Sequence, residues 1–193
     1  MTKAKIYLAG PDVFVRKPKE IFAKKKQICA RYGLIGVSPL DSGASAEGKR
    51  PFDAAMDISR ANERLMDACD VIIANMAPFH GPSMDIGTAY EMGYMRAKGK
   101  IVLGYSCTRE KFFDRVRAFF GGNLQKRDDG LSYEDSNAMQ VENFGLEDNL
   151  MVVGAVRASR GEVETDGSPS DCVFDNLVAF ERCTARAREL LGD

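Results

Sequence analysis

The sequence predicts an α/β fold with a doubly wound, flavodoxin-like parallel sheet that carries helices on both faces. Short apolar segments alternate along the chain with longer segments in which apolar residues recur at helical spacing. The lengths of these segments suit right-handed crossover units, which join parallel strands through a helix. The first apolar segment ends in Gly10-Pro11-Asp12, which is typical of the turn that follows a buried strand.

The expected elements alternate regularly through the first half of the chain. We expect strands at residues 5–9, 34–37, 71–74 and 101–104, separated by helices at 18–32, 52–68 and 86–97. Further on we expect a helix at 108–120, a last strand at 150–156 and a C-terminal helix at 172–191. Polar segments without periodicity predict a loop over a site at 42–50, an insertion or mobile loop at 121–148, and turns at 158–171.

Length and composition limit the kinds of protein this chain can be. Its 193 residues suit one domain, 1–193, with one core. The 27 Lys and Arg residues nearly balance 28 Asp and Glu, so we expect a small substrate and no nucleic acid polymer. Charges interrupt every apolar run, and Met1–Gly10 lacks a secretory signal, so we expect no membrane association and a cytoplasmic location. Five scattered cysteines predict reduced, packed thiols.

The segment after the third expected strand carries two carboxylates into a helix. Open parallel sheets bind ligands at the carboxyl ends of their strands, so this segment is a candidate site. Asp85 stands where the helix should begin, and there a carboxylate accepts hydrogen bonds from free backbone amides. Helix capping and the binding of a substrate hydroxyl are equally open for Asp85.

Glu91 is the one charged residue between Ile86 and Met95, in a helix that we expect to be buried on nearly all sides. A buried carboxylate needs a partner, a proton or a ligand, and a structural salt bridge is the competing interpretation. Gly87 lies four residues earlier on the same face and leaves room beside it. A carboxylate can attack the anomeric carbon of a sugar, so glycosyl transfer is open to Glu91.

A leaving nucleobase needs hydrogen-bond donors or a general acid nearby. Neighbouring segments offer four candidates, which are Tyr7, Asn62, Asp12 and Asp41. His80, the single histidine, lacks a second metal ligand, and we favour a loop position for it over a catalytic role. No Gly-x-Gly-x-x-Gly follows the first strand and no Gly-Lys-Ser/Thr is present, so we expect no nucleotide cofactor and no metal.

Three motifs resemble those of the nucleoside 2-deoxyribosyltransferase family. They are Lys5-Ile-Tyr-Leu-Ala-Gly10, Asp85-x-Gly-x-x-x-Glu91-x-Gly-Tyr94 and Asp148-Asn149-Leu150-Met151. They occur in order from residue 5 to about residue 151. The resemblance implies transfer of a 2-deoxyribosyl group from a 2'-deoxynucleoside to a free purine or pyrimidine base. The reaction would pass through a covalent deoxyribosyl-Glu91 intermediate, with hydrolysis as a side reaction.

The resemblance also implies a role for individual residues. Glu91 matches the catalytic nucleophile, Tyr7 a tyrosine that positions it, and Asp85 a carboxylate that binds the sugar 5'-hydroxyl. Asn149 and Met151 match residues that a neighbouring subunit contributes to the sugar site. The expected assembly is therefore a homo-oligomer built from dimers, up to a hexamer.

Other positions bear on how the substrate is held. Gly10, Phe14 and Gly87 are expected at the substrate site, together with Asn62. Asn62 stands where relatives often carry a base-contacting Asp, and Gly43 falls near where some place a base-contacting Gln. An amide can both donate and accept, so purines and pyrimidines both stay open, with a slight preference for purines.

Two alternatives compete with this function. The related deoxynucleoside 5'-monophosphate N-glycosidases share the Gly-x-x-x-Glu-x-Gly core but receive the phosphate on small hydroxyl residues, where this chain has Asp85. A carboxylate within about 4 Å of a phosphate repels it by a few kcal/mol at a surface dielectric, which favours an unphosphorylated nucleoside. The second alternative is a non-catalytic nucleotide-binding module, because fold alone does not fix function.

Overall fold

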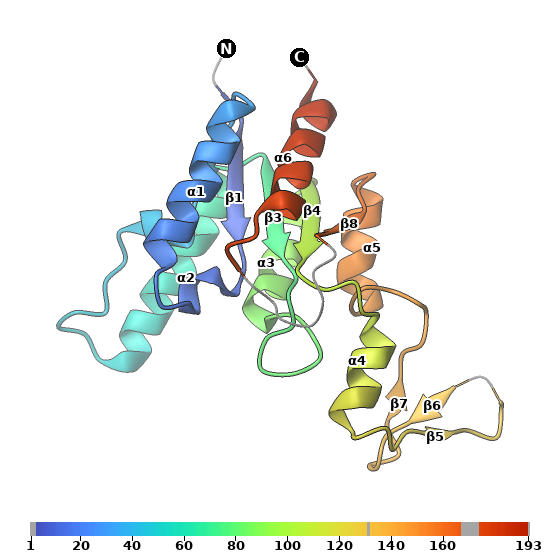
Figure 1. Cartoon of the computed structure of the whole chain (residues 1–193). Helices are drawn as coiled ribbons and strands as arrows, with labels where there is room; N and C mark the ends of the chain where they lie inside the picture. Colours follow the sequence, from blue (N-terminus) through green and yellow to red (C-terminus); the bar gives the residue numbers. More distant parts are fainter. Residues whose placement is uncertain (1–2, 131, 167–173, 193) are drawn as a thin grey trace.

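The structure, a computed structural model, describes residues 3–130, 132–166 and 174–192. Five strands form a parallel sheet in the order β2-β1-β3-β4-β8 (Figure 1). The strands are β1 (Lys5–Ala9), β2 (Ile35–Val37), β3 (Val71–Asn75), β4 (Ile101–Ser106) and β8 (Val163–Thr165). The chain crosses from β2 past β1 to β3 through helices, which confirms the doubly wound α/β fold.

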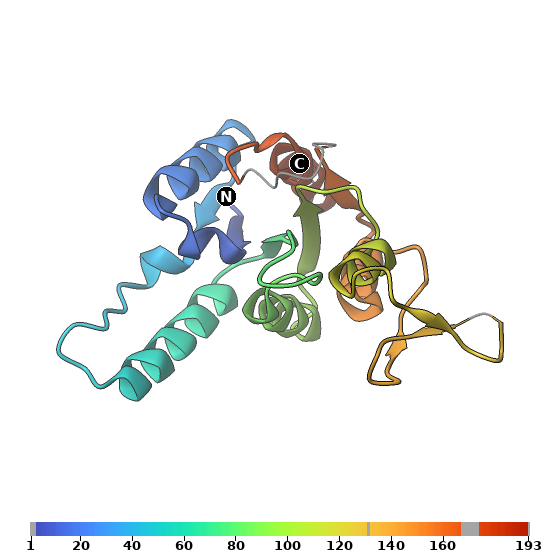
Figure 2. The same ribbon diagram turned by 60° about the horizontal axis from the view of Figure 1, so that its bottom comes forward.

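Helices cover both faces of this sheet (Figure 2). One face carries α1 (Pro18–Arg31) and α6 (Val178–Leu191), and the other carries α2 (Pro51–Asp67), α3 (Ile86–Ala97) and α5 (Leu150–Ala158). Alternate residues of β1 enter opposite cores, because side chains along a strand point to opposite faces. Leu8 therefore packs in the first core and Tyr7 in the second.

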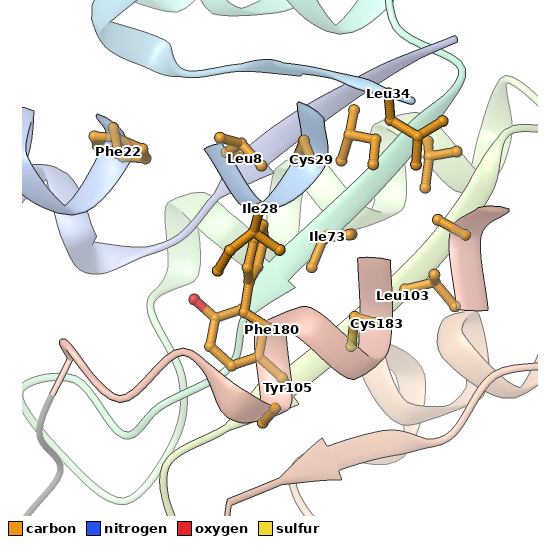
Figure 3. Packing of buried hydrophobic residues seen from close by; sticks show 14 residues of the cluster. Leu8, Phe22, Ile28, Cys29, Leu34, Ile73, Leu103, Tyr105, Phe180 and Cys183 are labelled. Atoms are coloured by element: carbon orange, nitrogen blue, oxygen red, sulfur yellow. The ribbon is translucent and has the colours of Figure 1, made fainter. Parts of the chain in front are cut away.

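The two cores differ in the kind of side chain that fills them. The first contains aliphatic and aromatic residues, and Figure 3 shows Phe180 beside Tyr105, with ring centroids 5.7 Å apart. The second core lies under α2, α3 and α5 and contains five buried methionines, which are Met66, Met76, Met84, Met92 and Met95. No buried methionine of the described residues belongs to the first core.

The expected last strand at 150–156 is wrong, because this segment forms α5. A short apolar run is consistent with either a buried strand or a buried helix, and periodicity cannot separate the two. The side chain of Asn149 caps the helix by accepting a 3.0 Å hydrogen bond from the Met151 amide. The last strand of the sheet is β8, inside the segment expected as turns; residues 167–171 of that segment lie outside the described residues. The C-terminal helix begins at Val178, and residues 172–173 of its expected range are also not described.

The segment 121–148 is not simply a loop. It contains a small antiparallel sheet of β5 (Gln125–Lys126), β6 (Tyr133–Glu134) and β7 (Gln140–Val141). Figure 1 shows this sheet apart from the main one and next to α4 (Phe112–Phe119). The ring centroids of Phe113 and Tyr133 lie 4.8 Å apart, so an aromatic contact joins the insertion to α4.

The cysteines agree only in part with the expectation of reduced thiols. Cys29, Cys69 and Cys183 are free and buried, and burial raises the pKa of each thiol. Cys107 is disulfide-bonded, so the expectation is wrong for this residue, and Cys172 lies outside the described residues. In the described ranges, no helix has both the length and the apolar character needed to cross a membrane.

The Asp12 carboxylate joins α1 and the carboxyl end of β3 to the turn after β1, through an ion pair and a hydrogen bond. Lys25 of α1 is 1% exposed and lies 2.8 Å from the Asp12 carboxylate, in the short 3-10 helix η1 (Pro11–Phe14). The Asn75 amide donates to the other Asp12 oxygen at 3.1 Å. Burial lowers the pKa of Lys25, and the Asp12 charge opposes that change. Both Asp12 oxygens are thus engaged within the protein, which argues against the donor role considered for it.

Substituting Gly10 should damage this junction. Gly10 has φ 145°, and a Cβ there would lie 2.6 Å from both Asn75 Cβ and Asp12 Oδ2. Strain and overpacking together predict that Gly10→Ala lowers the free energy of unfolding by roughly 2–4 kcal/mol, measured by urea denaturation. The control is Gly154→Ala in α5, where the added methyl meets nothing within 4 Å and should stabilise by about 0.5–1 kcal/mol. Equal stabilities for the two variants would contradict this account.

Candidate active site

Tyr7 and Glu91 meet between the sheet and α3. Tyr7 is fully buried on the face of β1 that α3 covers. Its hydroxyl donates a 2.6 Å hydrogen bond to Glu91 Oε1, across a sequence separation of 84 residues. The structure therefore brings together the two residues that, by the resemblance, match the nucleophile and the group that positions it.

The environment of Glu91 keeps its carboxyl group partly protonated near neutral pH. Burial raises the pKa of Glu91 to about 7, the Tyr7 hydrogen bond lowers it, and the charge of Asp85 raises it further. Among the described residues, no cationic nitrogen lies within 4.0 Å of the Glu91 carboxylate. The salt-bridge interpretation of Glu91 therefore finds no support.

The expectation that α3 is buried on nearly all sides is wrong for the single chain. Its buried residues are Thr88, Met92 and Met95. On the outer face Ile86 is 86% exposed and Tyr90 is 56% exposed. An apolar pattern does not show whether the covering surface belongs to the same chain or to another one, which explains the error.

Glu91 lines a pocket of about 370 Å³ between α2 and α3. Its other lining residues are Ala55, Ile58, Ser59, Asn62, Glu63, Met66, Gly87 and Tyr90. The volume and the mostly apolar walls with few polar groups suit a small organic ligand. Asn62 Oδ1 is buried and accepts no hydrogen bond from the described residues, so its acceptor capacity is unused. Asn62 and Gly87 thus share the pocket with Glu91, as expected.

Asp85 caps the helix that carries Glu91. Its Oδ2 accepts hydrogen bonds from the Thr88 backbone amide and the Thr88 hydroxyl, both at 2.8 Å. Among the contacts of the described residues, none uses Oδ1. A Cβ on Gly87 would lie 3.2 Å from Oδ2, so the missing side chain also clears the Asp85 carboxylate. Capping accounts for one carboxylate oxygen and leaves the other for a ligand.

Four further expected site residues do not line this pocket. Gly10 lies against Asn75 at the ends of β1 and β3. Phe14 is 67% exposed and stacks on Phe79, with ring centroids 5.3 Å apart. Asn149 and Met151 lie at the start of α5.

Two other polar candidates are accounted for by contacts elsewhere. Asp41 accepts hydrogen bonds from Lys26 at 2.6 Å and from the Ser38 amide at 2.8 Å. These bonds outweigh partial burial and lower its pKa, so it is a poor proton donor. His80 is exposed, has φ 55° and packs against Phe79, which agrees with a loop position.

Sequence reasoning missed two contacts near the site. The Tyr90 hydroxyl donates a 2.5 Å hydrogen bond to Glu63, which joins α2 and α3 beside the pocket. Arg115 and Asp148 form a buried ion pair behind the loop that leads into α3. Asp148 belongs to a motif that the resemblance had already marked, but Arg115 is one of several charges in its helix and carries no sequence signal.

Comparison with known proteins identifies the family. A model of the nucleoside 2-deoxyribosyltransferase family matches residues 6–151, and the chain belongs to this family. The family is one of glycosyl-transferring enzymes. An uncharacterized protein of Schizosaccharomyces pombe is 35% identical over 172 residues, which cover 84% of this chain and 82% of that protein.

Solved structures agree with this assignment. The chain is similar to the 2-desoxiribosyltransferase from Leishmania mexicana, with 27% identity, a TM-score of 0.60, and coverage of 94% of this chain and 97% of the other. A conserved protein from Enterococcus faecalis V583 has 20% identity and a TM-score of 0.55, with coverage of 96% and 99%. At this identity the second similarity shows the fold alone.

The burial of Glu91 predicts a pH-dependent effect of replacing it. A carboxyl group whose pKa rises on folding binds protons more tightly in the native state, so the native protein loses stability as pH rises from 4.5 to about 7. Glu91→Gln removes this loss and should raise the free energy of unfolding at pH 8 by on the order of 2–3 kcal/mol. Below pH 4.5 the two proteins should be alike.

Denaturant titrations at several pH values measure this difference. The matched control is Glu162→Gln, which changes an exposed carboxylate that pairs with Arg157. A Glu91→Gln variant that is less stable than the wild type at pH 8 would show that the ionised carboxylate is compensated in the native state.

Proposed function

We propose that this protein transfers the 2-deoxyribosyl group of a 2'-deoxynucleoside to a second nucleobase. The observation that carries the proposal is Glu91, a half-buried carboxylate without a cationic partner among the described residues, at the wall of a pocket of nucleoside size. A Glu91 oxygen attacks the anomeric carbon and forms an ester as the N-glycosidic bond breaks, and the first base leaves with a proton taken from solvent water. A second base then attacks the sugar ester and releases Glu91, while attack by water gives hydrolysis.

Tyr7 prepares Glu91 for this attack. Its hydroxyl bonds Oε1, which leaves Oε2 for the sugar. Burial and the neighbouring Glu91 charge raise the pKa of Tyr7, so the phenol stays protonated and remains a donor. A fixed donor on one oxygen holds the carboxylate plane without neutralising its charge.

Asn62 is suited to hold the base. Its buried Oδ1 has no hydrogen-bond partner among the described residues, and burying such a group without a ligand costs free energy. The side-chain amide offers both an acceptor and donors, which serve either a purine or a pyrimidine edge. The apolar wall of Ile58 and Met66 gives the flat ring a surface to pack on.

Asp85 favours a nucleoside with a free 5'-hydroxyl. A helix N-terminus would otherwise attract a phosphate, but here the Thr88 amide already bonds the Asp85 carboxylate. The remaining Asp85 oxygen can accept a hydrogen bond from a hydroxyl and would repel a phosphate. This argues against the 5'-monophosphate N-glycosidase alternative.

The site is proposed to be completed by a second copy of the chain. Met151 is 72% exposed and adjoins Asn149 at the start of α5, and neither residue lines the pocket of its own chain. Exposed apolar side chains of α2 and α3 include Phe52, Ile86 and Tyr90, of which Tyr90 lines the pocket. A neighbouring Asn149–Met151 segment would cover part of this surface and exclude water from the intermediate.

The direct test is base exchange. The protein is incubated with a 2'-deoxynucleoside and a different free base, and chromatography follows the new nucleoside. Glu91→Ala should lower turnover by at least about 1,000-fold, because it removes the nucleophile. Since the nucleophile must be ionised, kcat/KM should rise with pH to a plateau with a midpoint near 7.

Different outcomes of this assay separate the alternatives. Base release without exchange would assign a hydrolase, and turnover restricted to 5'-monophosphates would overturn the argument from Asp85. If neither base exchange nor base release is observed, the remaining alternative is a non-catalytic nucleotide-binding module. Full activity of Glu91→Ala would place the nucleophile elsewhere.

Mixed oligomers test the contribution of a neighbour. Asn149→Ser keeps the helix cap but removes the amide, and it should be nearly inactive alone, as should Glu91→Ala. Co-expression of the two variants should restore activity, because one site of each mixed dimer then combines an intact Glu91 with an intact Asn149. For random dimers the expected recovery is about a quarter of wild-type activity. No recovery in purified mixed oligomers would place Asn149 outside the neighbour's site.

A further inference from the structure

A buried ion pair joins α4 to the segment before α5, and both of its residues also bond the loop that leads into α3. Arg115 is 8% exposed and Asp148 is 1% exposed, and their charged atoms lie 3.0 Å apart. The guanidinium also donates to three backbone carbonyls, those of Pro82 at 2.7 Å, Glu147 at 2.8 Å and Glu110. Arg115 thus connects the loop before α3, the start of α4 and the segment before α5.

Asp148 accepts the remaining hydrogen bonds of this network. Its Oδ1 accepts hydrogen bonds from the Ser83 hydroxyl at 2.9 Å and the Asn149 amide at 2.8 Å. Its Oδ2 accepts one from the Met84 amide at 3.1 Å as well as one from Arg115. Each carboxylate oxygen therefore has two donors, and the buried charge is fully satisfied.

The cost of this arrangement points to a role other than stability. Burying a charged pair requires the desolvation of both groups, and well-packed apolar residues often stabilise a core equally well or better. The pair instead fixes the positions of the groups bonded to it, because a planar guanidinium and a carboxylate make hydrogen bonds only in defined directions. The groups so fixed are backbone atoms next to two residues of the proposed site.

The first of these residues is Asp85, which directly follows Met84. The Asp148 carboxylate anchors Ser83 and Met84, and the next residue begins the helix that carries Glu91. A shift of this anchor would move the free oxygen of Asp85 relative to a bound sugar. The Tyr7–Glu91 hydrogen bond, by contrast, lies on the sheet side of α3 and makes no contact with Arg115.

The second residue is Asn149, whose backbone amide bonds the same Asp148 oxygen as Ser83. Its side-chain amide is held by Glu142 at 2.6 Å. One carboxylate therefore orients both the subunit's own Asp85 and the segment that it offers to a neighbour.

We infer that Arg115 is a positioning residue which, through Asp148, sets the place of Asp85 and hence the recognition of the sugar 5'-hydroxyl. This inference rests on the proposed function. Arg115 touches no substrate, and its effect on turnover passes through the backbone at Met84 and Asp85.

The test compares two substrates that differ by one oxygen, a 2'-deoxynucleoside and its 2',5'-dideoxy counterpart. Wild-type kcat/KM should favour the hydroxyl by roughly 10- to 100-fold, as a hydrogen bond to a carboxylate predicts. Arg115→Lys keeps the positive charge but cannot reach all its acceptors, and this preference should fall about 10-fold. Turnover of the dideoxy substrate should stay within about 3-fold of wild type.

A milder variant and a matched control accompany this test. Ser83→Ala removes one hydrogen bond to Asp148 and should lower the preference by about 3-fold, even if Arg115→Lys does not fold. Arg117→Lys changes an exposed arginine of the same helix, paired with Asp114 at 3.6 Å, and should leave the preference unchanged. Equal losses for both substrates in Arg115→Lys and Ser83→Ala would overturn the inference and leave Arg115 a purely structural role.

Binding measurements test the role of Arg115 even if the protein does not catalyse the proposed reaction. Dissociation constants of the same two nucleosides are measured by calorimetry in the Glu91→Gln background, with and without Arg115→Lys. If the wild type shows no turnover but Arg115→Lys still abolishes the preference in binding, the proposed reaction fails and the inference holds. If neither turnover nor a preference for the hydroxyl is found, both fail.

Discussion

The hydrogen bond between Tyr7 and Glu91 is the contact on which the site depends, because it joins the first strand of the sheet to the helix that carries the proposed nucleophile. Tyr7 is fully buried and Glu91 is half-buried, and in such surroundings a hydrogen bond is stronger and a charge less stable than at the surface. The same burial that raises the pKa of Glu91 also keeps the Tyr7 phenol protonated. One local environment therefore sets the reactivity of the acid and the donor that orients it.

Two buried ion pairs hold the loops around this contact. Lys25 and Asp12 fix the turn after β1, and Arg115 and Asp148 fix the loop before α3. Each pair joins a helix to the carboxyl edge of the sheet, where the backbone leaves regular structure and has few partners of its own. Free energy is spent on desolvation to hold irregular backbone in place, as in many binding sites built on loops.

The sequence predicted four of the five strands of the main sheet, because buried strands and the helices between them leave local patterns. The meeting of Tyr7 with Glu91 spans 84 residues, and only the resemblance of their motifs to those of the family implied it. The prediction from sequence failed at 150–156, where a brief apolar run fits a strand or a helix and only tertiary packing decides. It also overestimated the burial of α3, since periodicity reports apolar faces and not what covers them. The Arg115–Asp148 pair could not be predicted, because the two residues lie 33 positions apart and their side chains meet only in the folded chain.

Because of the methionines under α3, the core on that side of the sheet deforms more easily than the core on the other side. A thioether side chain has several rotatable bonds and a soft, polarisable surface, so it can adapt to small displacements at little cost. The aliphatic and aromatic core under α1 and α6 is stiffer, and it keeps the strands in register. The helix that bears Glu91 therefore rests on a compliant layer above a rigid one, so this carboxylate can shift by a small amount while the strands keep their positions.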